Sequence, residues 1–280
     1  MTETTKTIDI LLLGSGGREH ALAKKLAESP RCGTLYIAPG NGGTLQEGVN
    51  VALAEDDPEA VAAFAREEGI GLVVIGPEAP LVAGVADAVR AAGIACFGPG
   101  AEGAQMEGSK RFSKELMERA GIPTAAYGSF TDEEAALAYV REQGAPLVVK
   151  ADGLAAGKGV VVATEQGQAE EAVRECFAGA FGDAGSTVVI EECLTGPECS
   201  LLAFTDGKTV RPMATAQDHK RALEGDRGPN TGGMGVYSPV PIVTDEELAV
   251  MKRVMVDTVA ELAAEGIDYR GCLYGGFMLT

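Results

Sequence analysis

The first hundred residues alternate short apolar runs with helical patterns, and this alternation constrains the fold more than any other feature of the chain. The apolar runs are bounded by turn residues and have the length of buried strands. Pro58 is placed for a first helical turn, and Gly69 and Gly93 are placed as C-terminal stops. The alternation predicts a parallel sheet with helices on both faces. The expected strands are Ile8–Leu13, Leu35–Ala38, Leu72–Ile75 and Ile94–Phe97, and the expected helices are Glu19–Glu28, Pro58–Glu68 and Leu81–Ala92.

The alternation of strands and helices changes after Gly98-Pro99-Gly100. A helix is expected at Lys110–Ala120, and shorter strands and helices follow it. This mixture predicts a second, α+β domain. We expect a first domain over residues 1–104 and a second over 105–280. Its other expected elements are the strands Leu147–Lys150, Val160–Ala163 and Val188–Glu191 and the helices Asp132–Gln143 and Gln168–Phe177.

The charge balance excludes one class of partner. Asp and Glu number 41 against 23 Lys and Arg, giving a formal net charge of −18. Such a surface repels nucleic acid, whereas local backbone N–H groups and a few cations can still bind a small phosphorylated ligand.

Cysteine spacing and hydropathy indicate the compartment. The six cysteines form no C-x-x-C pair, which argues against zinc and disulfide frameworks, and no apolar run approaches a membrane span of about 20 residues. We expect a cytoplasmic protein with reduced thiols and no membrane partner.

Gly14–His20 follows the first strand and opens a helix, a position where glycines let backbone N–H groups approach an anion. This indicates a phosphate or substrate loop, although a tight turn without a ligand has the same pattern. A dinucleotide fingerprint requires a third glycine where Glu19 stands and an acid at the end of the second strand. The second strand instead runs into Pro39-Gly40-Asn41, which disfavours NAD.

Two further loops, Pro39–Thr44 and Gly76–Pro80, follow the second and third expected strands. Each alone reads as a plain turn. The carboxyl ends of parallel strands share one edge, where open α/β sheets bind ligands, so we expect all three loops to meet there.

Lys150–Gly159 joins two strand-like runs as a glycine-rich hairpin with two lysines. It lacks P-loop spacing, so it is interpreted as a flap over a triphosphate or as a surface hairpin. Val188–Leu194 ends in two acids that are suited to ribose hydroxyls, but solvated charge at a strand end is the more common interpretation.

Ala216–Arg221 is polar and ionisable, and Gly228–Gly235 is glycine-rich. Both are too polar to be core. His219 is a candidate general base, but beside Asp218 and two cations a substrate-holding role is equally compatible. His20 lies at a helix start and is interpreted as structural.

Together these segments, with Gly108-Ser109-Lys110, closely resemble the phosphoribosylamine–glycine ligase family, also called glycinamide ribonucleotide synthetases. These are ATP-grasp enzymes of purine biosynthesis. The resemblance implies a Rossmann-like pre-ATP-grasp domain and then an ATP-grasp domain with a small lid subdomain near residues 125–192.

The resemblance also implies roles for individual residues, in three groups. Lys110 and Lys150 contact ATP phosphates and Asp152–Gly159 closes over them, while Glu191 to Cys193 face the adenine and Glu198 the ribose. The ATP group is Lys110, Lys150, Asp152, Gly153, Gly157, Lys158, Gly159, Glu191, Glu192, Cys193 and Glu198. The substrate group is Gly16, Gly17, Arg18, Glu19, Asn41, Pro77, Glu78, Asn230, Thr231, Gly232 and Gly233. The catalytic pair is Asp218 and Lys220.

The reaction implied is phosphorylation of glycine by ATP with Mg²⁺ or Mn²⁺, followed by attack of 5-phosphoribosylamine on the glycyl phosphate. The family's metal-binding Glu and Asn have no counterpart in this sequence, which ends in the strand-like Phe277–Thr280. We therefore expect a C-terminally truncated form whose metal ligands would lie beyond Thr280. Without these ligands we expect weak or no activity. A monomer or homodimer is expected.

Two rival functions remain at this point. Another ATP-grasp carboxylate–amine ligase or carboxylase would differ in what Asp218–Arg221 and Gly14–Arg18 recognise. A nucleotide-binding fragment or interaction module would bind ATP without glycine-dependent turnover. A dehydrogenase is disfavoured by the first loop.

Overall fold

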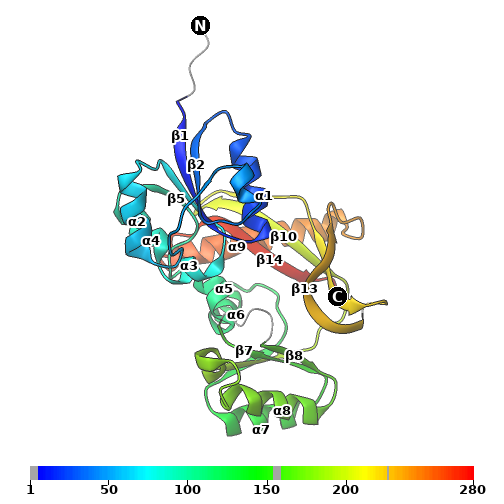
Figure 1. Cartoon of the computed structure of the whole chain (residues 1–280). Coiled ribbons are helices and arrows are strands. Elements are labelled where there is room, and N and C mark those ends of the chain that lie inside the picture. The colour runs from blue at the N-terminus through cyan, green and yellow to red at the C-terminus, as the bar shows by residue number, and fades with distance from the viewer. Residues whose placement is uncertain (1–5, 154–158, 226) are drawn as a thin grey trace. The chain divides into compact units, whose positions relative to one another are not determined.

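The computed structural model describes residues 6–153, 159–225 and 227–280. The chain divides into two compact units, coloured along the sequence in Figure 1. Unit 1 extends to Ala104 and includes residues 267–271, and unit 2 comprises Gln105–Gly266 and Cys272–Thr280. The inclusion of residues 267–271 in the first unit was not predicted.

Unit 1 contains a five-stranded sheet in the order β3-β2-β1-β4-β5. Every pairing in it is parallel, which confirms the predicted parallel sheet. β3 is only two residues long, too short to leave an apolar run in the sequence. The strands are β1 (Ile8–Gly14), β2 (Cys32–Pro39), β3 (Val49–Asn50), β4 (Leu72–Ile75) and β5 (Ala95–Phe97).

Helices cover both faces of this sheet (Figure 1). Side chains of a strand alternate between its faces, so Ile10 and Leu12 of β1 pack with Ala23 of α1 (Gly17–Ala27). Leu11 and Leu13 belong to the opposite core, with α2 (Pro58–Glu67) and α4 (Val85–Ala91). This is why β1 is a continuous apolar run.

The helix expected at Leu81–Ala92 is wrong as a single element. The structure has α3 (Glu78–Val82) and α4, separated by Gly84 with φ +86°. A residue with φ in the left-handed region cannot continue a right-handed helix, and glycine adopts it without a Cβ clash. Gly84 therefore ends one helix and precedes the next.

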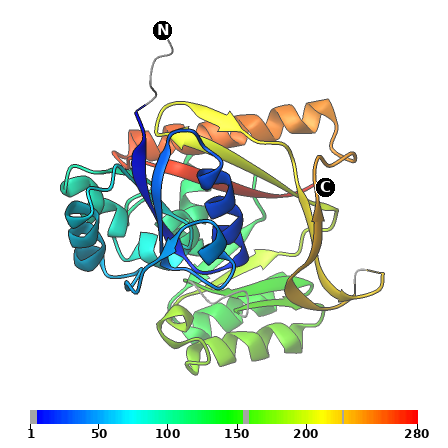
Figure 2. The same cartoon turned by 45° about the horizontal axis from the view of Figure 1, so that its top comes forward.

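Within unit 2, residues 127–192 form a four-stranded antiparallel sheet in the order β6-β9-β7-β8, the four-stranded subdomain. Figure 2 shows its two helices side by side on one face, and they bury an apolar core there. Asp132 caps the first helix by accepting the N–H of Ala135. The elements are β6 (Tyr127–Phe130), α7 (Glu133–Gln143), β7 (Leu147–Ala151), β8 (Val160–Ala163), α8 (Gln166–Phe177) and β9 (Val188–Glu192).

The rest of unit 2 contains a three-stranded sheet, β11-β10-β14, and a two-stranded antiparallel ribbon, β12-β13. Met255 and Leu262 of α9 are buried, as is Leu201 of β10. The elements are α5 (Gln105–Gly108), α6 (Lys110–Arg119), β10 (Glu198–Asp206), β11 (Val210–Pro212), β12 (Gln217–Leu223), β13 (Arg227–Tyr237), α9 (Asp245–Ala264) and β14 (Arg270–Met278), with 3-10 turns at Thr44–Gln46 and Gly182–Ser186.

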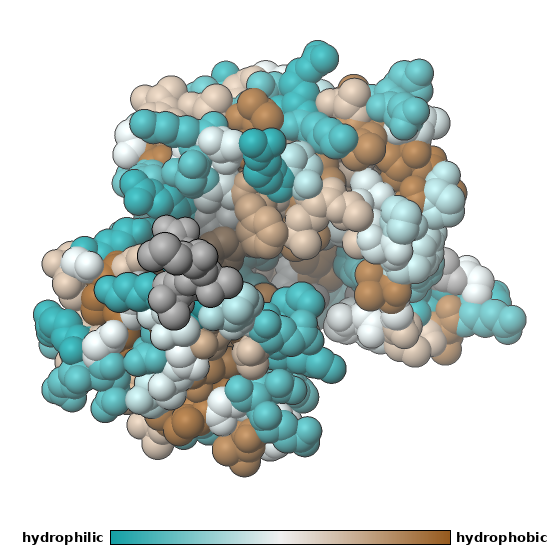
Figure 3. All heavy atoms as spheres, turned by 90° about the horizontal axis from the view of Figure 1, so that it is seen from above, coloured by the Kyte–Doolittle hydropathy of each residue, from teal (hydrophilic) through white to brown (hydrophobic). Residues whose placement is uncertain are grey.

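The face of the molecule in Figure 3 is mostly hydrophilic, with separate apolar patches. Across the described ranges, no helix combines the length and apolar character that crossing a membrane requires.

Candidate functional site

The turn after β1 is built around a buried carboxylate. Glu19 is 3% exposed, and it accepts the N–H of Gly16 at 2.9 Å and Nε of Arg18 at 2.6 Å. A Cβ at Gly14 or Gly76 would collide with the Glu19 side chain, and Gly14 has φ +126°. Glycine is therefore required at these two positions because Glu19 fills the space between the loops that follow β1 and β4. Its expected role as a substrate contact is untested.

Arg18 joins the same two loops from the solvent side. Its Nη1 donates to Oε1 of Glu78 at 2.8 Å, and about half of its side chain is exposed. Burial by itself would raise the pKa of Glu78, but the hydrogen bond and charge of Arg18 outweigh it and lower that pKa. Pro77 immediately precedes Glu78, the first residue of α3.

Asn41 connects the loop after β2 to this group. Its Nδ2 donates to the carbonyl of Ser15 at 2.8 Å, and its Oδ1 accepts from the N–H groups of Gly43 and Thr44. A Cβ at Gly43 would meet the His20 ring, so His20 packs against the loop after β2, and its structural role stays a prediction. The three loops meet at the carboxyl edge of the sheet, as predicted.

A second group of charges surrounds Glu191 at the end of β9. Lys150 Nζ lies 2.8 Å from one carboxylate oxygen, and Lys114 Nζ lies 3.3 Å from the other. Lys114 and Glu191 are each only 7% exposed. Lys114 was not among the predicted site residues, although its place one helical turn after Lys110 was a usable signal.

Lys110 and its neighbours hold the start of the glycine-rich hairpin. Lys110 Nζ donates to the carbonyl of Gly153 at 2.9 Å, and Asp152 accepts from the Ser109 hydroxyl at 3.0 Å and from the Arg111 N–H at 3.1 Å. Burial lowers the pKa of Lys110; the charge of Asp152 opposes this, and that of Lys150 adds to it. Gly157 and Lys158 lie outside the described residues, and the Gly159 carbonyl accepts the N–H of Ala151.

Helix α6 contacts the four-stranded subdomain at its middle and end as well. Lys114 also donates to Thr124 Oγ1 at 2.7 Å and to the carbonyl of Ala125 at 3.2 Å. Glu118 accepts from the hydroxyl of Tyr127 at 2.9 Å. Lys110, Lys114 and Glu118 are four residues apart in turn, so they share one face of the helix.

After β9 the chain leads from Glu192 and Cys193 to Glu198 at the start of β10. The N–H of Glu192 donates to the carbonyl of Ala126 at 2.8 Å. Glu192 is exposed and Cys193 is half-buried.

The two stretches predicted as polar and glycine-rich pair with each other as β12 and β13. Lys220 Nζ lies 2.6 Å from Glu198 and 3.5 Å from Asp218. Burial would lower the pKa of Lys220, but the bond to Glu198 and the charge of Asp218 raise it. Asp218, Lys220 and Glu198 therefore form one ion group.

The glycine-rich strand is tied to this group through Thr231. Its hydroxyl donates to the carbonyl of Lys220 at 2.9 Å and accepts the N–H of Gly233 at 3.1 Å. The backbone of Asn230 is opposite Arg221, and Gly232 lies between Thr231 and Gly233. The ring of His219 stacks near Tyr237 with centroids 5.6 Å apart.

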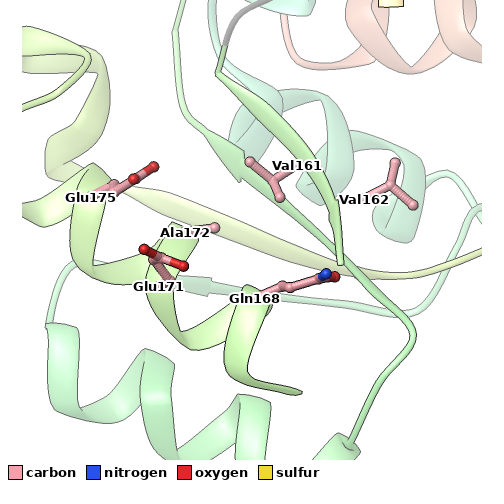
Figure 4. A pocket seen from close by; sticks show the side chains of 6 residues that line it. All are labelled: Val161, Val162, Gln168, Glu171, Ala172 and Glu175. Atoms are coloured by element: carbon pink, nitrogen blue, oxygen red, sulfur yellow. The ribbon is translucent and has the colours of Figure 1, made fainter. Parts of the chain in front are cut away.

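Away from these groups, a shallow hollow of about 340 Å³ lies between β8 and α8 (Figure 4). Val161, Val162, Gln168, Glu171, Ala172 and Glu175 line it. Its two carboxylates would repel a phosphate, so it does not fit the predicted nucleotide.

In residues 6–153, 159–225 and 227–280, no group of three or more His, Cys, Asp and Glu side chains could hold a metal ion. These residues therefore do not by themselves fit the Mg²⁺ that the resemblance implies.

The sequence matches two domains of one family along almost its full length. Residues 8–107 match the N domain of phosphoribosylglycinamide synthetase, and residues 108–280 match its ATP-grasp (A) domain. The chain is 59% identical over 274 residues to phosphoribosylamine–glycine ligase of Allochromatium vinosum, covering 96% of this chain. It spans 64% of the length of that relative.

Two solved structures have a similar fold. Phosphoribosylamine–glycine ligase of Thermotoga maritima is 32% identical with a TM-score of 0.80, covering 97% of this chain and 66% of that one. The biotin carboxylase domain of Hydrogenobacter thermophilus 2-oxoglutarate carboxylase, solved with MgADP, ADP and bicarbonate, is 18% identical with a TM-score of 0.74. It covers 98% of this chain and 61% of that one, and at this identity it supports the fold alone.

Proposed function

Because the chain belongs to the phosphoribosylglycinamide synthetase family, we propose that it forms part of an ATP-dependent ligase that joins glycine to 5-phosphoribosylamine. The products are glycinamide ribonucleotide, ADP and phosphate, and the pathway is purine biosynthesis. The observation that carries the proposal is the lysine cluster: Lys114 and Lys150 pair with one buried carboxylate, and Lys110 bonds the start of the glycine-rich hairpin. Such a local excess of positive charge can bind ATP on an acidic protein.

In the proposed nucleotide site, Lys110 and Lys150 bind the phosphates, and Asp152, Gly153 and Gly159 of the hairpin border them. The carboxylate of Glu191 is engaged by two lysines. We therefore assign the adenine edge to the backbone around Glu192 and Cys193, and the ribose to Glu198.

The proposed site for 5-phosphoribosylamine is the loop cluster of unit 1. There the N-terminus of α1 directs backbone N–H groups outward from Gly17 and Arg18, which favours a phosphate. Asn41 and Glu78 border this loop and supply polar contacts.

The reaction has two steps. A glycine carboxylate oxygen attacks the γ-phosphorus of ATP, and ADP leaves, giving glycyl phosphate. The amine of 5-phosphoribosylamine then attacks the acyl carbon; the C–N bond forms, the C–O bond to phosphate breaks, and the nitrogen loses a proton. Asp218 and Lys220, next to Asn230–Gly233, are assigned to hold glycine and the transferred phosphoryl group, so positioning and charge neutralisation supply the catalysis.

In this proposal ATP enters with Mg²⁺, as membership in a family of ATP-grasp ligases implies. No step above is assigned to the metal, since the described residues do not hold it. We place the enzyme in the cytoplasm, because the six cysteines are free thiols, as reducing compartments favour.

The test is ADP release from ATP, Mg²⁺ and 5-phosphoribosylamine, with and without glycine, for this chain and for the chain extended by the C-terminal part that its relatives have. We expect glycine-dependent release by the extended protein, its loss in Lys150→Ala, and weak or no release by residues 1–280. ADP release without glycine dependence would instead favour another acyl substrate of an ATP-grasp enzyme. Equal rates for the two lengths would contradict the expected weakness of this chain.

A further inference from the structure

Glu191 is a buried carboxylate shared by two cations. Lys150 pairs with one oxygen at 2.8 Å and Lys114 with the other at 3.3 Å. The three side chains together have a net charge of +1. One carboxylate with two ammonium groups is therefore an arrangement that an incoming anion stabilises.

The two lysines differ in their freedom to meet that anion. The Lys114 side chain is 8% exposed and is also fixed by Thr124 and Ala125, with the Tyr127 ring 5.5 Å away. The Lys150 side chain is 26% exposed. Lys150 is thus the member that can turn to a ligand, whereas Lys114 is held inside.

Turning Lys150 towards a phosphate weakens its bond to Glu191. A buried carboxylate left without a partner is strongly unfavourable. The carboxylate keeps a full counter-charge here, because Lys114 stays in contact with its other oxygen.

We infer that Lys114 is a positioning residue for nucleotide binding: it keeps Glu191 paired and so leaves Lys150 available for phosphates. This inference rests on the nucleotide site of the proposed function. Without Lys114, Lys150 would be the only cation on Glu191 and would be held there. Burial lowers the pKa of Lys114 and Glu191 opposes that shift, as expected for an enclosed cation with one partner.

The test compares binding of ADP and of adenosine, measured by calorimetry on the full chain. Lys114→Met removes the charge but keeps much of the stem, and the Lys150–Glu191 pair stays neutral, so the fold is expected to survive. Lys114→Met combined with Glu191→Gln removes the carboxylate that would hold Lys150. Lys208→Met, at an exposed turn position, is the matched charge control.

We expect Lys114→Met to weaken ADP binding about tenfold or more, as loss of a charged contact does, with adenosine affinity unchanged. The double variant should recover most of the ADP affinity, and Lys208→Met should match the wild type. Equal ADP affinity in Lys114→Met and wild type would overturn the inference. So would an equal loss for adenosine, which marks general damage, or the absence of recovery in the double variant.

The two proposals fail in different ways. A wild-type chain that binds no ADP overturns the nucleotide site and this inference with it. A wild-type protein that binds ADP but, in the extended form, shows no glycine-dependent turnover overturns only the proposed substrates.

Discussion

Arg18 in unit 1 and Lys150 in unit 2 are both held by glutamates, but the charge around them has opposite sign. Arg18 bonds to two carboxylates, Glu19 and Glu78, so its group has a net charge of −1. Lys150 shares one carboxylate, Glu191, with Lys114, and that group has a net charge of +1. Similar side chains therefore sit in groups with different capacity for an anion.

The difference indicates how each site can bind phosphate. The charge of Arg18 is already balanced twice, so in the proposed site its loop would bind phosphate through backbone N–H groups at the start of α1. The lysine cluster has positive charge in excess, which suits a polyphosphate. Lys220, with Glu198 and Asp218, resembles the Arg18 group and suits positioning better than charge neutralisation.

The largest expected effect is the loss of ADP affinity when Lys150 is replaced. Lys150→Ala should weaken ADP binding about 10- to 100-fold, because a charged hydrogen bond to phosphate is lost. Calorimetry with ADP measures it, with Lys208→Met as the control. An unchanged affinity would show that the excess positive charge does not meet the nucleotide.

The next effect is on the stability of unit 1. Arg18→Ala removes a partner of buried Glu19 and should lower the free energy of unfolding by about 1–3 kcal/mol, while ADP affinity stays the same. Denaturant unfolding measures the first and calorimetry the second, with exposed Arg31→Ala as the control. Loss of ADP binding in Arg18→Ala would contradict the view that only the group around Lys150 binds the nucleotide.

A smaller effect is expected at Lys220. Its group has the same net charge as that of Arg18, but neither of its carboxylates is buried: they are 50% and 31% exposed, against 4% for Glu19. Lys220→Met should change the free energy of unfolding by less than about 1 kcal/mol. A loss as large as that of Arg18→Ala would mean that charge count, and not burial of the carboxylate, decides stability.

The smallest effect is a dependence on pH. The pKa of Glu78 is lowered in the folded chain, so the Arg18–Glu78 pair stabilises the fold above pH 4.5, and this contribution is lost as pH falls below that value. Between pH 6 and pH 3, the midpoint temperature of thermal unfolding should therefore fall slightly less in Glu78→Gln than in wild type. Parallel curves would assign no stabilising role to this pair.

The sequence was informative wherever local patterns decide the structure. Glycine and proline mark the ends of strands and helices in unit 1, and the order of its loops placed Arg18 near Glu78, 60 residues away. The helix break at Gly84 was not predicted, because Gly84 lies among small apolar residues and its φ of +86° cannot be inferred from their composition.

The sequence was less informative where long-range contacts decide. Lys114 lies in a helix whose many charged residues are typical of an exposed helix, and the contact with Glu191 on β9 explains its burial. The two segments of the ribbon β12-β13 were described only as polar and glycine-rich, and no strand was assigned to them, because Gln217–Leu223 has no apolar alternation. The roles assigned to individual site residues stay predictions.

Helix α6 has a consequence for how this chain tolerates changes of length. Lys110, Lys114 and Glu118 contact the four-stranded subdomain from one face, at successive turns. Deleting or inserting one residue between them would rotate the later contacts by about 100° around the helix axis. Natural variation in this segment should therefore replace residues freely on its outer side while keeping the number of residues between Lys110 and Glu118 constant.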